Sequence, residues 1–257
     1  MQTTVDRLYQ EMLQAIVECE LSPGASFSEA ELGRRYSASR TPIREACRRL
    51  ENDGLIRIAP FRGYSIVPLS VKEFLELEEL QLIIEPAAAA LAAVRISEEQ
   101  LAALEGCAFY EYQKGDPKSY REFIQSNYKF HTVIAQASRN KQLCKMVENV
   151  QIRLMRFFYL GLPFDSWGEQ LVTEHRSLVE AIRNHRPEEA RRFATVHLQN
   201  AMQRSNVGTM NAIRFGEMIF DPSSSEPVVW MSNKMMSNAA FPRSRTPHKK
   251  QHSSSKL

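Results

Sequence analysis

Residues 28–53 constrain the fold of this 257-residue chain most strongly, because they combine two helix starts with a run of arginines. Ser28 and Glu31 have capping-box spacing, in which each side chain bonds the backbone of the other residue at a helix N-terminus. Thr41 followed by Pro42 is a second start signal, since a hydroxyl caps a helix and proline suits its first position. The pattern predicts two short helices joined by a tight turn.

The second of these helices is expected to have one apolar and one basic face. Its apolar residues follow the i, i+3, i+4, i+7 spacing of a buried stripe, at Ile43, Ala46, Cys47 and Leu50. Arg40, Arg44 and Arg48 step by four residues and share another face. A short helix with a positive N-terminus and outer face suits contact with phosphates and base edges. A solvated amphipathic helix pair with an arginine-rich surface is the alternative interpretation.

The flanking segments favour the DNA-binding interpretation. Apolar residues within 8–17 predict a preceding helix, and residues 55–58 and 64–67 predict two short strands around a turn. Three helices followed by a hairpin are typical of a winged helix-turn-helix. Arg62 and Gly63 at the hairpin tip are expected to enter a minor groove or contact the DNA backbone, since glycine permits close approach.

Composition limits the remaining possibilities. No apolar run approaches the roughly 20 residues needed to span a bilayer, so no membrane association is expected. The N-terminus lacks the pattern of a signal peptide. The four cysteines lie far apart along the chain, which is typical of small buried residues in a reducing compartment. We therefore expect a cytoplasmic protein.

The chain is expected to be mainly α and to contain two domains. Residues 1–69 form the predicted winged helix-turn-helix. Residues 70–208 are almost entirely helical in pattern, and short connections between helices predict an antiparallel bundle of six or seven helices. Residues 209–257 contain prolines, serine runs and seven basic against three acidic residues, which predicts a disordered basic tail.

Histidines within the bundle indicate a metal site. His131 lies one helical turn after Asn127, so both side chains project from one face. His175 and His197 are equally distant from a turn near residue 186, so antiparallel helices would place them side by side. Three imidazoles and one amide oxygen suit zinc, nickel or a similar divalent ion and leave positions open for a ligand. Hydrogen-bonded packing histidines are the alternative.

Two arginines on the same predicted helix are candidates for binding a carboxylate effector. Arg153 and Arg156 carry guanidinium groups, which pair with carboxylates through two hydrogen bonds. The alternative is that both form surface or interdomain ion pairs.

Residues 28–67 resemble the DNA-binding domain of GntR-type bacterial transcription regulators. The resemblance rests on the run Ser-Arg-Thr-Pro-Ile-Arg-Glu-Ala at residues 39–46, on Gly-Leu-Ile at 54–56 and on Arg-Gly-Tyr at 62–64. It implies operator contacts from Ser39, Arg40, Thr41 and Arg44, backbone contacts from Arg35 and Arg48, and a wing tip at Gly63. The chain departs from the family at Ser37, where the turn usually has glycine, and at Ala30, where an arginine is common.

Residues 71–208 resemble the FadR-type C-terminal ligand-binding domain, known as the FCD domain. The resemblance rests on residues 85–87, 127–131, 174–176 and 190–198. It implies metal ligands at Asn127, His131, His175 and His197, and a metal that holds the carboxylate of a small organic acid. The family usually has aspartate at the first position, so Asn127 implies weaker metal binding. The family often has an arginine four residues before Glu85, and Gln81 at this position implies a weakened anion contact.

The expected function is a transcription regulator, usually a repressor, that binds a palindromic operator in double-stranded DNA as a homodimer. One short recognition helix offers too few base contacts for specificity, and protein symmetry then mirrors DNA symmetry. A small carboxylate effector would change operator affinity. Two alternatives stay open: a metal-dependent hydrolase or lyase with an accessory winged helix, and an architectural DNA-binding protein whose bundle only dimerises.

Overall fold

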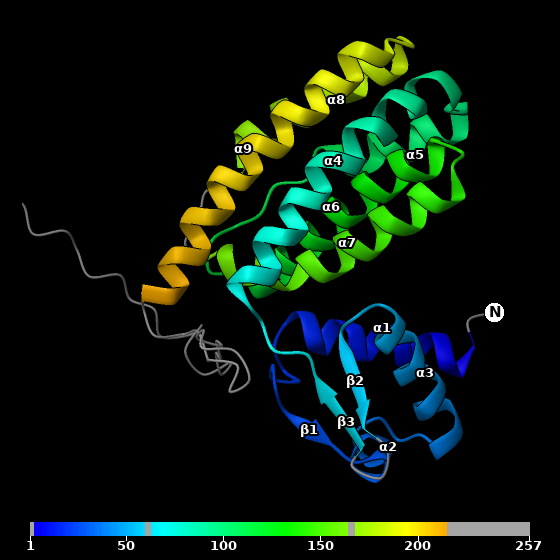
Figure 1. Ribbon diagram of the computed structural model, residues 1–257, viewed down its shortest axis with the longest axis vertical. Coiled ribbons are helices and arrows are strands. Elements are labelled where there is room, and N and C mark those ends of the chain that lie inside the picture. Colours follow the sequence, from blue (N-terminus) through cyan, green and yellow to red (C-terminus); the bar gives the residue numbers. More distant parts are fainter. Residues whose placement is uncertain (1–2, 60–62, 164–167, 215–257) are drawn as a thin grey trace, which may run out of the picture.

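A small N-terminal module lies beside a larger helical bundle in the computed structural model, which describes residues 3–59, 63–163 and 168–214 (Figure 1). Residues 209–214 of the tail expected over 209–257 are helical, and residues 215–257 lie outside the described residues. This arrangement confirms the mainly α fold class. The module consists of α1 (Thr4–Val17), β1 (Ser26–Phe27), α2 (Glu29–Arg35), α3 (Arg40–Asn52), β2 (Ile56–Ala59) and β3 (Gly63–Ile66).

The turn between α2 and α3 follows local sequence chemistry. Ser28 and Glu31 form the reciprocal capping box that begins α2, as expected. Ser37 in the turn has a φ of +49°, in the left-handed region that glycine adopts without strain. The departure from glycine at this position therefore places a serine in a mildly unfavourable backbone conformation.

The start of α3 corrects one prediction. Ser39 is the N-cap residue and α3 begins at Arg40, although the Ser39 side chain makes no capping hydrogen bond. The assignment of Thr41 as the cap was wrong. Pro42 instead lies within the first turn, where its missing N–H removes a donor that has no partner inside the helix.

The sheet has three strands, with β3 antiparallel to and between β1 and β2. Tyr64 is paired with Phe27 on one side and with Ile58 on the other. The sequence predicted only β2 and β3, because the two residues of β1 are too few to show an alternating pattern. The predicted hairpin is confirmed.

The predicted apolar stripe of α3 is confirmed as the core of the module. Ile43, Ala46, Cys47 and Leu50 are all fully buried. They pack with the buried face of α1 in one cluster that continues into the bundle, where it includes Phe74. The two parts of the chain therefore share an apolar contact.

The bundle contains six helices within the described residues, in agreement with the expected number. The helix α4 is central, since it contacts α6, α7, α8 and α9. Within the part of the chain that the structure describes, no helix has the length and hydrophobicity needed to cross a membrane. The helices are α4 (Val71–Arg95), α5 (Glu98–Ala108), α6 (Pro117–Ala137), α7 (Lys141–Gly161), α8 (Gly168–Arg183) and α9 (Pro187–Arg214).

Polar contacts also join the module to the bundle. Arg121 of α6 donates to both carboxylate oxygens of Glu18, with Nη2 2.6 Å from Oε2. Arg156 of α7 donates from Nη2 to the carbonyl of Val67, 2.5 Å away, in the segment that leads from β3 to α4. The module is thus held at α1 and again at its connection to the bundle.

Candidate nucleic-acid interface and metal centre

The helix α3 presents Arg40, Arg44 and Arg48 to solvent, away from its buried stripe. The Arg40 side chain is 81% exposed and that of Arg44 is 55% exposed. Ser39, Thr41 and Arg48 are exposed as well. The structure therefore brings these five predicted contact residues to the accessible side of α3 and its N-terminus.

Glu29, the first residue of α2, faces the N-terminal arginines of α3. Its Oε2 lies 3.1 Å from Nη2 of Arg44, and its Oε1 lies 3.9 Å from Nε of Arg40. Hydrogen bonding and charge attraction from Glu29 raise the pKa of Arg44. Glu29 therefore pairs with the exposed guanidinium of Arg44.

The remaining basic residues of the module lie in different surroundings. Arg49 is turned toward α1, where its Nη1 lies 2.7 Å from Oδ1 of Asp6. Arg35 is exposed and forms a long ion pair of 3.4 Å with Glu20. Arg62, the predicted wing residue, lies outside the described residues.

Gly63 has a structural reason for being glycine. Its φ is +92°, and a β-carbon at this position would collide with the carbonyl of Phe27 on the neighbouring strand. The proposed close approach to DNA is therefore not needed to explain this glycine, because the sheet itself requires it.

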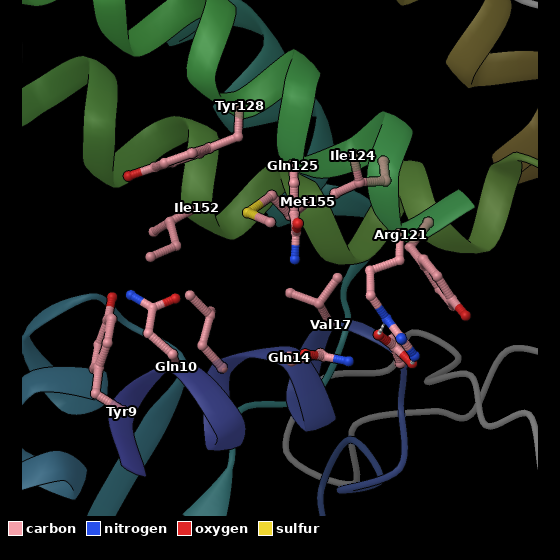
Figure 2. Close-up of a pocket in the computed structure, with 13 residues that line it drawn as sticks. Tyr9, Gln10, Gln14, Val17, Arg121, Ile124, Gln125, Tyr128, Ile152 and Met155 are labelled. Carbon is pink, nitrogen blue, oxygen red and sulfur yellow. Dashed lines mark hydrogen bonds and ion pairs between the residues drawn. The ribbon is translucent and has the colours of Figure 1, made fainter. Parts of the chain in front are cut away.

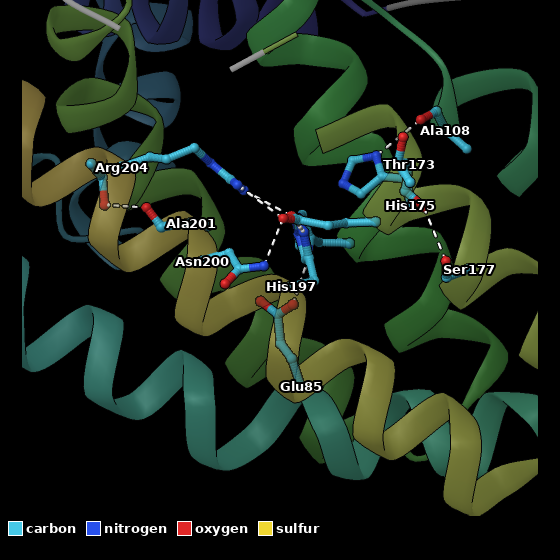
Figure 3. A network of polar contacts seen from close by, with 12 residues as sticks. Glu85, Ala108, Thr173, His175, Ser177, His197, Asn200, Ala201 and Arg204 are labelled. Atoms are coloured by element: carbon cyan, nitrogen blue, oxygen red, sulfur yellow. Dashed lines mark hydrogen bonds and ion pairs between the residues drawn. The ribbon is translucent and has the colours of Figure 1, made fainter. Parts of the chain in front are cut away.

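The three histidines of the bundle converge. His131 comes from α6, His175 from α8 and His197 from α9, and each offers a ring nitrogen within 4.8 Å of the others. All three side chains are buried. The Phe130 ring stacks on His175 with centroids 3.8 Å apart and fixes the plane of that imidazole. Figure 3 shows His175 and His197 directed into the interior of the bundle.

Each imidazole is oriented through its Nδ1 atom. The Nδ1 atoms of His131, His175 and His197 lie 2.6 Å from Oε2 of Glu85, 3.0 Å from the carbonyl of Ala108 and 2.9 Å from Oε2 of Glu174. Carboxylate and carbonyl oxygens only accept, so each Nδ1 carries the proton. The Nε2 atoms are left with lone pairs, which is how metal-binding histidines are held.

Burial favours the neutral form of two of these rings, His175 and His197. Desolvation lowers the pKa of His197, and it lowers the pKa of His175 well below its usual value, with further lowering by the two neighbouring imidazoles. Nε2 of His175 is buried without a hydrogen-bond partner among the described residues. A buried acceptor without a donor is unfavourable unless an ion or a ligand satisfies it. The donor set therefore fits a divalent cation.

Asn127, the fourth predicted ligand, lies one turn before His131 on α6 and is 8% exposed. Its side chain thus projects from the same buried face of the helix. Its role as a ligand stays a prediction.

Two buried carboxylates that support the histidines were not assigned this role from sequence. Gln151 donates to Oε1 of Glu85 at 2.5 Å, and Gln81 also bonds Glu85. Burial raises the pKa of Glu85, but the charge and hydrogen bond of His131 outweigh burial, and the net pKa is lowered. One signal was present in the sequence: Glu78, Gln81 and Glu85 have the spacing of one helical face, which is the buried face of α4.

Glu174 is fixed in a second polar network. Arg204 donates to both of its carboxylate oxygens, and Asn200 donates to Oε1 (Figure 3). Burial raises the pKa of Glu174, but bonds from Arg204 and His197 outweigh burial and hold the pKa at about 2. Arg204 and His197 thus hold the Glu174 carboxylate ionised and in place.

The candidate effector residues occupy different places. Gln81 is buried and bonds Glu85, which in turn bonds His131, and its role in effector binding stays a prediction. Arg153 and Arg156 do not join these residues. Arg153 forms an ion pair with Glu73 in the first turn of α4 and lies against Gly54 of the module.

Arg156 is buried at the junction of module and bundle, where it binds the Val67 carbonyl. Both arginines therefore lie at the junction of module and bundle and not beside the histidines, so the structure does not assemble the carboxylate clamp predicted for them. Arg153 forms its ion pair within the bundle, and Arg156 binds a backbone carbonyl. Periodicity along α7 placed them on the helix but could not show which of its faces meets the module.

Comparison with known families divides the chain in the same way as the structure. Residues 4–66 match the model for bacterial regulatory proteins of the gntR family. Residues 76–200 match the model for the FCD domain. The first match covers α1 to β3, and the second begins in α4 and includes all three histidines.

Curated relatives are similar over most of their length. The HTH-type transcriptional regulator YdhC of Bacillus subtilis (strain 168) is 29% identical over 196 residues, which cover 76% of this chain and 87% of YdhC. The HTH-type transcriptional repressor RspR of Escherichia coli (strain K12) is 28% identical over 193 residues, covering 75% of this chain and 85% of RspR.

Solved structures share the fold. McbR/YncC of E. coli superposes with a TM-score of 0.64 at 20% identity, covering 80% of this chain and 98% of that protein. A GntR-type regulator from Rhodococcus sp. RHA1 gives a TM-score of 0.58 at 17% identity, covering 79% of this chain and 97% of that protein.

Proposed function

The chain belongs to the GntR family of bacterial regulatory proteins and carries an FCD domain, and from this premise we propose that it is a repressor controlled by a small organic acid at a metal site. It is a DNA-binding transcription regulator and not an enzyme. Repression is proposed because RspR, one of its relatives, is a repressor. Because its partner is DNA, we propose that the protein acts in the cytoplasm.

The observation that carries this proposal is the convergence of three imidazoles whose Nδ1 atoms are already occupied. His131, His175 and His197 would hold a zinc ion, or nickel or a similar divalent ion, through Nε2, with the Asn127 oxygen as the proposed fourth ligand. When bound, the ion supplies a positive charge that anchors a carboxylate at its open positions. The substitution of asparagine for aspartate favours an easily exchanged metal.

Buried polar residues around the histidines would complete recognition of the acid. Gln81 and Gln151 offer amide donors beside Glu85, on helices α4 and α7. We propose Arg204, in place of Arg153 and Arg156, as the cationic group that binds the acid. Its guanidinium bonds Glu174 beside His197, and its Nε is buried without a hydrogen-bond partner within the described part of the chain. An incoming carboxylate would compete with Glu174 for this guanidinium.

The proposed operator contacts are Ser39, Arg40, Thr41 and Arg44, with Arg35 and Arg48 at the DNA backbone and Arg62 and Gly63 at the wing. A phosphate would compete with Glu29 for Arg40 and Arg44. Because this competition involves exposed ion pairs, each worth little in water, it does not prevent binding. DNA must still displace the Glu29 carboxylate before it contacts Arg40 or Arg44, and this requirement disfavours weak binding to random DNA.

We propose a homodimer on a palindromic operator. Ile83 and Val94 on α4 are 66% and 62% exposed, and they lie on one face because eleven residues make about three helical turns. Large exposed apolar side chains on one face are typical of protein contacts. A dimer through this face would pair two α3 helices with two half-sites.

The helix α4 provides a route from the acid to DNA. It carries Glu85 beside His131, and its first turn carries Glu73, which pairs with Arg153 next to the module. A shift of α4 on ligand binding would therefore change how the module is held. The coupling requires different acid affinities in the DNA-bound and free arrangements.

The proposal is tested by operator selection followed by a screen of small organic acids. Fluorescence anisotropy should show tight binding of a selected palindrome by the zinc-loaded dimer and weakened binding with one class of acid. His175→Ala should keep DNA binding but lose the acid response, whereas Arg44→Ala should lose operator selection. Acid responses that persist in His175→Ala contradict the metal-site proposal, and unchanged selection in Arg44→Ala contradicts the DNA face.

A further inference from the structure

A cavity of about 390 Å³ separates α1 of the module from α6 and α7 of the bundle. Figure 2 shows the side chains of α1 facing those of α6 and α7 across it, with Tyr9 and Tyr128 near one end and Arg121 near the other. None of the three histidines lines this space, so it is separate from the metal centre.

The inner wall of this interdomain cavity is apolar. Leu13 and Val17 of α1 and Ile124, Ile152 and Met155 of the bundle line it, and each of them is at most 9% exposed. Volumes of about 300–1,000 Å³ with apolar walls at domain interfaces are typical of small-molecule sites. The volume and the wall chemistry therefore suit a compact ring system.

Hydrogen-bonding groups surround this apolar wall. Gln10, Gln14 and Gln125 line the cavity, and their amides have no hydrogen-bond partner among the described residues. Gln10 and Gln125 are exposed and come from opposite sides, so they form its rim. Each amide offers both a donor and an acceptor, which suits a ligand that also carries both.

The charge of the lining indicates an uncharged ligand. Glu18 and Arg121 are the charged residues that line the cavity, and they neutralise one another through two hydrogen bonds. No further charge in the lining would compensate an ionised ligand. Burying an unpaired ion against an apolar wall is unfavourable, whereas a neutral amide or phenol can bond the glutamines.

From this cavity we infer a second small-molecule site, between the DNA-binding module and the bundle, that accepts an uncharged planar aromatic compound bearing amide or hydroxyl groups. The site differs from the proposed metal-linked site in place and in ligand charge. Because α1 forms one wall and α6 and α7 the other, a bound compound contacts both domains. Its affinity therefore depends on how the domains are arranged, which would allow it to bias DNA binding.

Three probes with one ring and different charges test the site. 4-Hydroxybenzamide is neutral, 4-hydroxybenzoate is anionic and 4-hydroxybenzamidine is cationic. Titrations of the full chain followed by ligand-observed NMR should be made in EDTA, so that a metal-bound carboxylate does not contribute. We expect the neutral probe to bind with a Kd on the order of millimolar, as fragments of this size do, and the charged probes at least about tenfold more weakly.

Gln125→Trp should fill the rim from α6 and weaken binding of the neutral probe at least about tenfold. Gln142→Trp is the matched control, because Gln142 is exposed on α7 and does not line the cavity. It should leave the Kd within about twofold. Far-ultraviolet circular dichroism and thermal melting establish that both variants fold.

The inference would be overturned by no saturable binding of the neutral probe up to about 10 mM, by equal binding in Gln125→Trp, or by equal binding of all three probes. His175→Ala separates this site from the metal centre, since it should not alter binding of the neutral probe. Loss of probe binding in that variant would place the probe at the histidines and would also overturn the inference.

Discussion

Replacing Glu85 with glutamine should weaken metal binding without disturbing the fold. The Glu85 carboxylate accepts the Nδ1 proton of His131 at 2.6 Å and fixes the ring so that Nε2 faces the other two imidazoles. Glutamine has nearly the same shape and keeps one acceptor oxygen. The Gln151 amide, which now donates to Glu85, can rotate to present its own oxygen to the new amide.

The expected size of the effect follows from the role of such supporting groups. Loss of a hydrogen-bonded carboxylate behind a ligand histidine lowers metal affinity about 10- to 100-fold, or roughly 1.4–2.7 kcal/mol. The lower end applies where the hydrogen bond survives and only the charge is lost. We therefore expect a loss of at least about tenfold in zinc affinity for Glu85→Gln.

Competition with a chromophoric chelator measures the zinc affinity directly. Glu78→Gln is a matched control, because Glu78 is 1% exposed on the same helix but bonds Ser205 rather than a histidine. It should leave the zinc affinity within about twofold. Equal zinc affinity in Glu85→Gln and the parent, or an equal loss in both variants, would refute the assigned role of Glu85.

Three further predictions concern DNA, the sheet and pH. Arg44→Ala should weaken operator binding roughly tenfold or more in anisotropy titrations, since a bidentate arginine–base contact is lost; unchanged affinity would remove Arg44 from the interface. Gly63→Ala should lower the melting temperature more than Gly24→Ala, because both residues have positive φ but only Gly63 meets the Phe27 carbonyl; equal losses would contradict the clash. Burial raises the pKa of Glu78 to about 7 from 4.5, so the folded state holds this proton more tightly than the unfolded state. The contribution of Glu78 to stability should therefore fall as pH rises from about 4.5 through 7. Over that range the melting temperature of Glu78→Gln should rise relative to that of the parent; a constant difference between the two would contradict this.

Local sequence chemistry was sufficient for the elements that bury a repeating apolar stripe. The stripe from Ile43 to Leu50 and the capping box at Ser28 depend on contacts within a few residues, and both appear as expected. The strand β1 was missed because its two residues pair only with β3. The cap at Thr41 was wrong because serine and threonine near a helix start are chemically equivalent candidates.

The sequence was sufficient to predict that the histidines lie close together, because two of them are equally distant from one turn. The pairing of these histidines with carboxylates could not be predicted in the same way. Glu85 is 46 residues from His131 and reaches it through the packing of α4 on α6. Arg153 and Arg156 were misplaced for a related reason. The face of a helix that meets another domain depends on domain packing, which periodicity within one helix does not specify.

Cobalt titration of the metal-free chain tests the central claim most directly, because bound Co²⁺ has visible absorption that reports its ligands. The account predicts saturation at about one ion per chain, loss of the spectrum in His175→Ala, and a change in the bands when the inducing organic acid is added. No saturable binding, or the same spectrum in His175→Ala, would contradict the claim that His131, His175 and His197 bind a metal through their free Nε2 atoms.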